Sequence, residues 1–279
     1  MLSYQHGFHA GNFADVHKHM ILALIMEMLN LKDKPWSYLE THGGAALYDL
    51  ADDKAQKTGE YLEGIAKLWN RSDIPDAVLT YIAKVQAVNQ GKELKFYPGS
   101  PSIASMLARS SDRLAVMELH PAEYQQVKHH FRRQSQVAVH HRDGYEGVLS
   151  MMPPKPNRGL VLIDPSYEVK AEYQQVAKFV QQLLGRWPNG SVAIWYPILK
   201  AGQHQGMVDK IVASGIRNVY QSEFYVQNSG AERMIGSGML LINPPWQLDQ
   251  KIEAVMPWLN RMLSQRDAEE PLQRWLVPE

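Results

Sequence analysis

Residues 159–167 read GLVLIDPSY, and this stretch decides the fold of the chain. Its first five residues are apolar without alternation, which is typical of a strand buried in a parallel sheet. Pro165 cannot donate to a sheet ladder, so we expect the strand to end at Asp164. In open α/β sheets, ligands bind at the carboxyl ends of such strands. Asp164 is therefore predicted to lie at a binding site.

The turn that follows, Asp164-Pro165-Ser166-Tyr167, has the residue types needed to methylate an exocyclic amine of a nucleobase. An adenine amine is a poor nucleophile because its lone pair is conjugated into the ring. The Asp164 carboxylate and the Pro165 carbonyl can accept hydrogen bonds from its two N–H groups. Tyr167 offers a flat face for a base pulled out of its stack. We predict that Asp164, Pro165 and Tyr167 are catalytic; alternatively, the Asp caps a helix and the Pro only ends the strand.

Length and composition indicate a globular protein. The chain has 279 residues, 45% of them hydrophobic and 21% charged, which is enough to bury a full core. Lys+Arg and Asp+Glu both number 29, so any contact with nucleic acid must be local. The absence of Cys excludes thiol nucleophiles and Cys-ligated zinc. The amino terminus lacks a signal-peptide pattern and the longest apolar run, residues 20–26, is too short to span a bilayer, so we expect a cytoplasmic protein without membrane contact.

Strand and helix patterns alternate along most of the chain. A helix is expected over residues 14–31, and strands over 36–41, 113–118, 136–140, 159–164, 191–196, 218–225 and 238–242, before a C-terminal helix. This order predicts an α/β fold, with a mostly parallel sheet between layers of helices. Residues 51–97 break the alternation with two helical patterns. We therefore predict a main domain of residues 1–50 and 98–279, with a tail at 1–13, and an inserted helical subdomain at 51–97.

Polar residues follow the predicted strands in a recognisable order. The small-residue turn 42–46 comes first, then Glu118, Asp143-Gly144 and Asp164. A glycine turn lets a ligand approach the backbone, and an acid after the second strand can bind both hydroxyls of a ribose. Each feature alone is more often a turn or a helix cap. Together, in this order, they predict an S-adenosylmethionine site.

Two clusters of histidine and basic residues have no role assigned by the strand pattern. His17 and His19 are two residues apart and point to different faces of a helix, so we predict no metal site. The basic cluster at residues 128–133 could contact phosphates or form a solvated helix end.

The chain resembles the bacterial 23S rRNA adenine-N6 methyltransferases of the RlmJ type over nearly its whole length. The resemblance rests on motifs in the family's order, among them Leu2-Ser3-Tyr4, Phe8-His9-Ala10-Gly11-Asn12, Lys18-His19, Thr41-His42, Tyr97-Pro98-Gly99-Ser100-Pro101, Glu118-Leu119-His120-Pro121, Trp195-Tyr196-Pro197 and Ile242-Asn243-Pro244-Pro245-Trp246. It implies a Rossmann-like class I S-adenosylmethionine-dependent methyltransferase sheet with a small helical insertion. It also implies a cofactor pocket of His19, His42, Ser100, Glu118, Asp143, Gly144 and Asp164, with Tyr4, His6 and Lys18 near the substrate. The chain departs from the family pattern at Ala46, where the family usually has Gly, and at Ser166, where it usually has Pro.

The expected function is S-adenosylmethionine-dependent N6-methylation of a specific adenine in 23S rRNA by a monomer. Naked or partly assembled RNA is the expected form, because a neutral domain has little surface with which to bind a ribosome. Two alternatives stay open: DNA adenine methylation, and a DNA-handling accessory role in the use of external DNA as nutrient.

Overall fold

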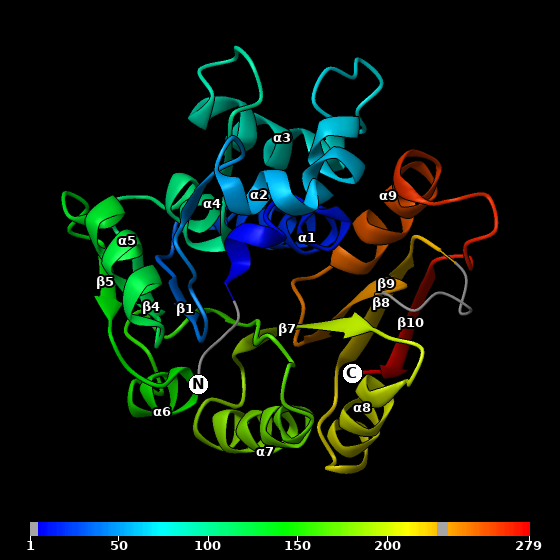
Figure 1. Ribbon diagram of the computed structural model, residues 1–279. Helices are drawn as coiled ribbons and strands as arrows, with labels where there is room; N and C mark the ends of the chain where they lie inside the picture. Colours follow the sequence, from blue (N-terminus) through cyan, green and yellow to red (C-terminus); the bar gives the residue numbers. More distant parts are fainter. Residues whose placement is uncertain (1–4, 228–233) are drawn as a thin grey trace.

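A computed structural model describes residues 5–227 and 234–279 and shows a central eight-stranded sheet (Figure 1). The strand order is β10-β8-β9-β7-β6-β1-β4-β5. The parallel part consists of β1 (Ser37–Glu40), β4 (Arg113–Met117), β5 (Val137–His140), β6 (Gly159–Ile163) and β7 (Ser191–Ile198). Three strands extend it in antiparallel pairings: β9 (Gly236–Ile242), β8 (Val219–Tyr225) and β10 (Leu272–Val277).

The parallel strands have the Rossmann order, which confirms the predicted α/β class. From β1 the chain builds outward to β4 and β5, then returns to place β6 on the other side of β1. The order therefore reverses between β1 and β6, and the loops that follow these two strands flank the place where such sheets bind ligands.

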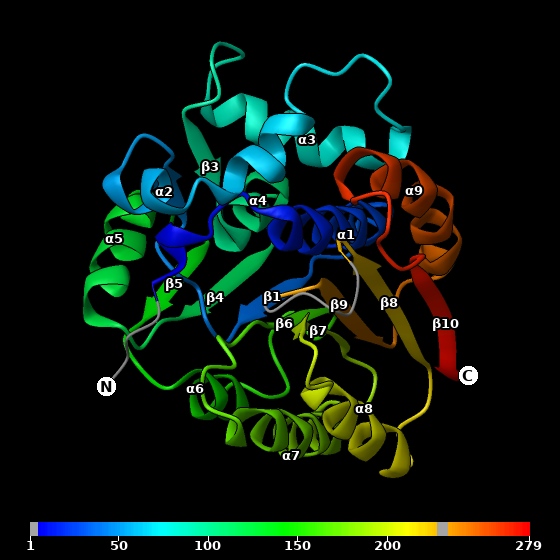
Figure 2. The ribbon, with the colours of Figure 1, turned by 45° about the vertical axis from the view of Figure 1, so that its right-hand side comes forward.

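Two layers of helices cover the sheet (Figure 2). Residues of β6 alternate between them: Leu160 and Leu162 pack into one hydrophobic cluster, Val161 and Ile163 into the other. The first cluster includes side chains of α1 (Phe13–Asn30), α3 (Asp76–Val88), α4 (Ser100–Leu107) and α9 (Leu248–Leu263). The second includes side chains of α6 (Gly144–Ser150), α7 (Ala171–Arg186) and α8 (Gln203–Ala213). Burial on both faces explains the continuous apolar run that the sequence shows.

The segment that breaks the alternation lies over the amino-terminal helix. It contains α2 (Asp53–Thr58), two 3-10 turns, η2 (Glu60–Glu63) and η3 (Ile65–Lys67), and α3. A two-stranded ladder of β2 (Leu47–Asp49) and β3 (Phe96–Pro98) joins its ends. Ile65, Tyr81 and Val85 belong to the same cluster as α1, so the segment shares its core with the sheet domain. We propose, as the sequence predicted, that residues 51–97 form an inserted subdomain.

Other elements differ from the expectation. The tail, expected to be irregular over residues 1–13, contains a 3-10 turn, η1 (His6–Phe8). The strands β2, β3 and β10 were not predicted, because they are short or carry exposed polar residues that blur the period of two. In the described part of the chain, no helix combines the length and the apolar character needed to cross a membrane.

Candidate active site

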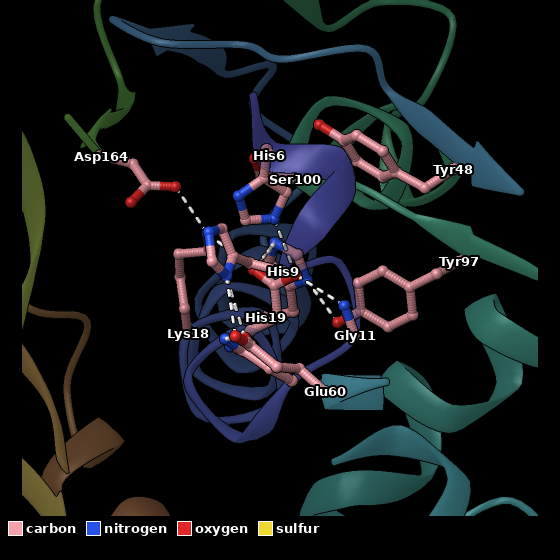
Figure 3. A network of polar contacts seen from close by, with 12 residues as sticks. His6, His9, Gly11, Lys18, His19, Tyr48, Glu60, Tyr97, Ser100 and Asp164 are labelled. Atoms are coloured by element: carbon pink, nitrogen blue, oxygen red, sulfur yellow. Dashed lines mark hydrogen bonds and ion pairs between the residues drawn. The ribbon is translucent and has the colours of Figure 1, made fainter. Parts of the chain in front are cut away.

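A pocket lies at the carboxyl ends of β1, β4 and β6, where the strand order reverses. His42 follows β1, Glu118 follows β4 and Asp164 follows β6. All three line the pocket, together with other predicted site residues: His6, Lys18, His19, Ser100 and Pro165. The tertiary structure thus brings most of the predicted set into one site, and Figure 3 shows the polar network along its wall.

The turn after β1 needs glycine at two positions. A Cβ on Gly43 would come within 2.2 Å of a Val116 methyl group, and Gly44 has a φ of +59°. The Gly43 N–H donates to the Met117 carbonyl at 2.9 Å, which ties the turn to β4. Ala46, at the position where the resembled family has glycine, has a φ of 69° and is fully buried. A left-handed conformation is costly for alanine, so this departure places strain beside the pocket.

Glu118 fixes the other side of the same turn. Its carboxylate accepts hydrogen bonds from the Gly44 N–H at 2.8 Å and from the His120 N–H at 2.6 Å. Burial raises the pKa of Glu118, although these two N–H groups act in the opposite direction. Glu118 thus lines the pocket with its carboxylate tied to the turn, and its role in binding a ribose stays a prediction.

Ser100 begins α4 and contacts a buried acid that the sequence analysis missed. Its hydroxyl donates to Glu40 Oε1, and the Glu40 side chain is inaccessible to solvent. Burial raises the pKa of Glu40 to about 8, so this carboxyl is largely protonated at neutral pH. The available signal was a glutamate directly after Tyr38 and Leu39 at the end of a predicted buried strand, where an unpaired charge is unfavourable.

Asp164 lines the pocket, and its carboxylate is held by a lysine from α1 (Figure 3). Lys18 Nζ donates to Asp164 Oδ2 at 2.5 Å and contacts Asp15 Oδ1 at 2.9 Å. Burial alone would lower the pKa of Lys18, but the two carboxylates outweigh it and the pKa is raised. Lys18 is therefore a fixed cation that orients the Asp164 carboxylate.

Asp15 anchors the amino-terminal segment over this cation. Its Oδ2 accepts hydrogen bonds from His6 Nε2 at 2.8 Å and from the Gly11 N–H at 2.9 Å. Burial would raise the pKa of Asp15, but His6 and Lys18 keep it well below its usual value. Burial would likewise lower the pKa of His6, but Asp15 raises it above the ordinary value. The sequence analysis did not assign a role to Asp15, although its partners Lys18 and Gly11 are only three and four residues away.

Tyr167 lies deeper than the sequence suggested. Its side chain is 5% exposed, its ring packs against Tyr173 at 4.4 Å, and its hydroxyl donates to the Trp195 carbonyl at 2.9 Å. A φ of 55° at Tyr167 turns the chain sharply after the motif. Its role in stacking a base stays a prediction.

A second groove adjoins the first pocket. Both are lined by His6, Lys18, Asp164 and Ser166, so the Asp164 carboxylate lies in the wall that they share. The groove extends between the inserted segment, with Lys57 and Glu60, and the apolar side chains of Phe13, Trp195, Pro197 and Leu263. Trp195 was not predicted as a site residue; its ring lies 6.1 Å from that of Tyr167 and faces Lys18 Nζ at 5.6 Å.

The remaining predicted residues are outside both cavities or outside the described part. Asp143 caps α6 by accepting from the Glu146 N–H at 2.9 Å, and Gly144 lies so close to Thr41 that a Cβ would be 1.9 Å from its carbonyl oxygen. Neither lines a pocket, so their cofactor roles stay predictions. Tyr4 lies outside the described residues.

Two histidines of the site, His19 and His42, differ from His6 in being neutral hydrogen-bonding groups. Burial lowers the pKa of His19 to about 3 and that of His42 to about 4. His19 Nδ1 pairs with the Tyr97 hydroxyl at 2.7 Å, and His42 Nδ1 with the Thr41 hydroxyl at 2.8 Å. Among the described residues, no group of three or more potential ligands could hold a metal ion.

The fold and the site together define an α/β protein that places an Asp-Pro-x-Tyr carboxylate between two cavities at the switch point of its sheet. Residues 33–277 match the family model described as "Ribosomal RNA large subunit methyltransferase D, RlmJ". The chain belongs to this family of methyltransferases, as the resemblance in the sequence implied.

Individual relatives agree with this assignment. The chain is 43% identical to "Ribosomal RNA large subunit methyltransferase J" of Escherichia coli K12 and 42% identical to the protein of the same name from Haemophilus influenzae; all chains are covered completely. A crystal structure of a Legionella pneumophila protein is similar with a TM-score of 0.89 and 34% identity, over 96% of this chain and 98% of that one.

Proposed function

We propose that this protein transfers a methyl group from S-adenosylmethionine to N6 of a specific adenine in 23S rRNA. The observation that carries the proposal is the position of Asp164 in the wall shared by two cavities. A transferase must bring the methyl donor in one binding site next to the acceptor atom in another. Asp164 lies between the two cavities that would hold them. The family relatives named for large-subunit rRNA support the choice of substrate.

The first pocket fits S-adenosylmethionine. Its lining includes the turn after β1, where a Cβ on Gly44 would come within 2.2 Å of the Tyr48 hydroxyl, and His19 Nε2, a buried polar atom for which the described residues provide no hydrogen-bond partner. Glu118 and Ser100 would bind the cofactor, with Gly43-Gly44 forming the base of the pocket. When bound, the cofactor supplies a methyl group on a sulfonium centre.

The second groove would hold the target adenine against Asp164. Lys18 Nζ donates a hydrogen bond to Asp164 Oδ2. Within the described chain, no group donates a hydrogen bond to Asp164 Oδ1. Oδ1 can therefore accept one N–H of the amine, and the Pro165 carbonyl can accept the other. These acceptors increase the electron density on the amine nitrogen, and they do so with little reorganisation because Lys18 holds the carboxylate in place.

Naked or partly assembled 23S rRNA, a monomeric enzyme and a cytoplasmic location complete the proposal. The chain carries no net charge, so it has little attraction for a fully assembled ribosome.

Transfer of tritiated methyl groups tests the proposal. The substrate is 23S rRNA from a strain that lacks the gene, and the modified base is then mapped. One labelled adenine carrying an N6-methyl group is the expected result. Labelling of genomic DNA in place of RNA would instead support a DNA adenine methyltransferase. Failure to bind S-adenosylmethionine would overturn the proposal in favour of an accessory DNA-handling role.

A further inference from the structure

One side of the protein is strongly basic although the whole chain is neutral. Residues 124–142 contain no Asp or Glu, and they carry Lys128, Arg132, Arg133, Arg142 and several histidines. This segment forms the end of α5 (Pro121–Phe131) and the whole of β5. β5 is the last strand of the sheet, and Figures 1 and 2 place α5 and β5 on the side of the molecule opposite α9 and β10.

The charged side chains of this segment reach solvent. Lys128, Arg132 and Arg133 are exposed and surround a hollow whose base includes Phe131 and Val137. None of the three forms an ion pair with an acid in the part of the chain that the structure describes. The negative end of α5 can account for Lys128 and for Arg132, whose Nη1 donates to the His129 carbonyl at 3.0 Å, but not for Arg133.

The basic side chains continue from this hollow to the catalytic edge of the sheet. β5 begins at the hollow and ends at His140, whose carbonyl accepts a hydrogen bond from the Glu118 N–H at 3.0 Å. Along the way, the Tyr124 ring stacks on His141 at 4.6 Å and faces Lys128 Nζ at 5.2 Å. We call this surface the basic strip; it consists of Lys128, His129, Arg132, Arg133, His141 and Arg142, and of these Arg142 is paired with Glu146 at 2.9 Å.

We propose that the basic strip binds the phosphate backbone of the RNA substrate, outside the target nucleotide. This inference rests on the proposed function, since it assumes an RNA substrate at the neighbouring site. Positive side chains that meet phosphates release counterions and supply affinity that does not depend on base sequence. In a protein without net charge, such affinity must come from a local surface. The strip reaches the pocket wall through His141, whose Nε2 contacts the carbonyl of Leu119, next to Glu118, at 3.1 Å. It would position the RNA while the groove beside Asp164 selects the base.

A triple variant, Lys128→Gln with Arg132→Gln and Arg133→Gln, tests the strip against a matched control. The control is Lys178→Gln with Lys210→Gln and Lys251→Gln, which removes the same charge from exposed lysines on α7, α8 and α9. Affinity for a 23S rRNA transcript is measured at several salt concentrations. We expect the strip variant to bind roughly tenfold to a hundredfold more weakly at 0.1 M salt, with the slope of log K against log salt reduced by about 2.

Kinetics separate docking from a general structural defect. The strip variant should show a raised KM for RNA, an unchanged kcat at saturating RNA and unchanged affinity for S-adenosylmethionine by calorimetry. If the triple variant fails to fold, the single variants at Lys128 and Arg133 are measured in the same way, with a slope change of about 0.7 each.

The outcomes distinguish this inference from the proposed function. Equal affinity and equal salt slope for the strip variant and its control would overturn the docking surface, whether or not the wild-type protein methylates rRNA. A wild-type protein that binds RNA through the strip but transfers no methyl group would overturn the proposed function alone. A wild-type protein that does not bind RNA would overturn both.

Discussion

Asp164 has one carboxylate oxygen fixed by Lys18 and the other directed to the substrate side in the proposed mechanism. Substituting Asp164→Asn keeps the shape of the side chain but allows an amide N–H to face the adenine amine, where an acceptor is required. We expect turnover to fall by on the order of a hundredfold or more. Single-turnover methyl transfer to 23S rRNA measures this, and a near-wild-type rate would show that the assigned role is wrong.

Glu40 makes stability depend on pH. Because burial raises its pKa to about 8, the folded state retains a proton that the unfolded state loses above its ordinary pKa of 4.5. The contribution of Glu40 to stability is thus complete below that value and decreases as pH rises through the window up to about 8. Glu40→Gln stays neutral, so its free energy of unfolding relative to wild type should increase across this window, by up to about 1 kcal/mol per pH unit. Urea unfolding at several pH values checks this; parallel curves for the two proteins would refute it.

Ala46 adopts a backbone conformation that favours glycine. Ala46→Gly would relieve about 1–2 kcal/mol of strain, and it would lose about 0.4–1 kcal/mol through the larger entropy of the unfolded chain. We expect a net stabilisation of about 0.5–1 kcal/mol in thermal unfolding. Ala45→Gly, at a neighbouring buried position that does not have a positive φ, is the control and should destabilise. Equal effects at the two positions would contradict the strain argument.

At the scale of elements, η1 and the start of α1 form a single unit around Asp15. His6 lines both cavities and contacts Asp15, which in turn contacts Lys18. The amino-terminal segment thus reaches the Asp164 carboxylate through two side chains, Asp15 and Lys18. Through these contacts, the amino-terminal segment can influence the position of Asp164, although it does not form the turn at the base of the first pocket.

Deletion of residues 1–10 tests this link. The turn after β1, Ser100 and Glu118 remain, so affinity for S-adenosylmethionine should stay within a few-fold of wild type. Methyl transfer should fall at least tenfold, because Asp15 loses His6 and Lys18 is held less firmly. Calorimetry and rRNA methylation are measured on the same preparation, with His6→Ala as a milder variant. Full activity of the truncated protein would exclude a role for the segment.

At the scale of the whole molecule, the inserted segment has two tasks. Its Lys57 and Glu60 line the groove beside Asp164, while Ile65, Tyr81 and Val85 share a core with α1. A wall of the groove and a stabilising layer therefore come from the same segment of the chain. This double role argues against an independent, removable module.

Replacing residues 51–97 with a short Gly-Ser linker should accordingly destroy cooperative folding. The ends are close enough to join, since the Leu50 N–H donates to the Lys95 carbonyl at 2.8 Å. Cooperative folding would be lost because removal of the segment exposes apolar surface of α1 to water. Thermal unfolding followed by circular dichroism measures this. A cooperative transition near the wild-type temperature would show that the sheet domain folds without the insertion.

The amino-acid sequence by itself determined the α/β class, the family and the order of polar residues after the strands. Apolar runs and strand ends are local patterns, so they can be identified without the fold. The motif at 164–167 and the acid at 118 follow their strands directly, and both line the predicted pocket.

Only the tertiary structure decided how these residues are held. Lys18 and Asp164 are 146 positions apart, and Ser100 and Glu40 are 60 apart, so no local period links either pair. Glu40 and Trp195 acquired their places in the same way, through Ser100 and Lys18, which are distant from them in the sequence. The ionisation of the site depends on burial and on these neighbours, and both exist only in the folded chain.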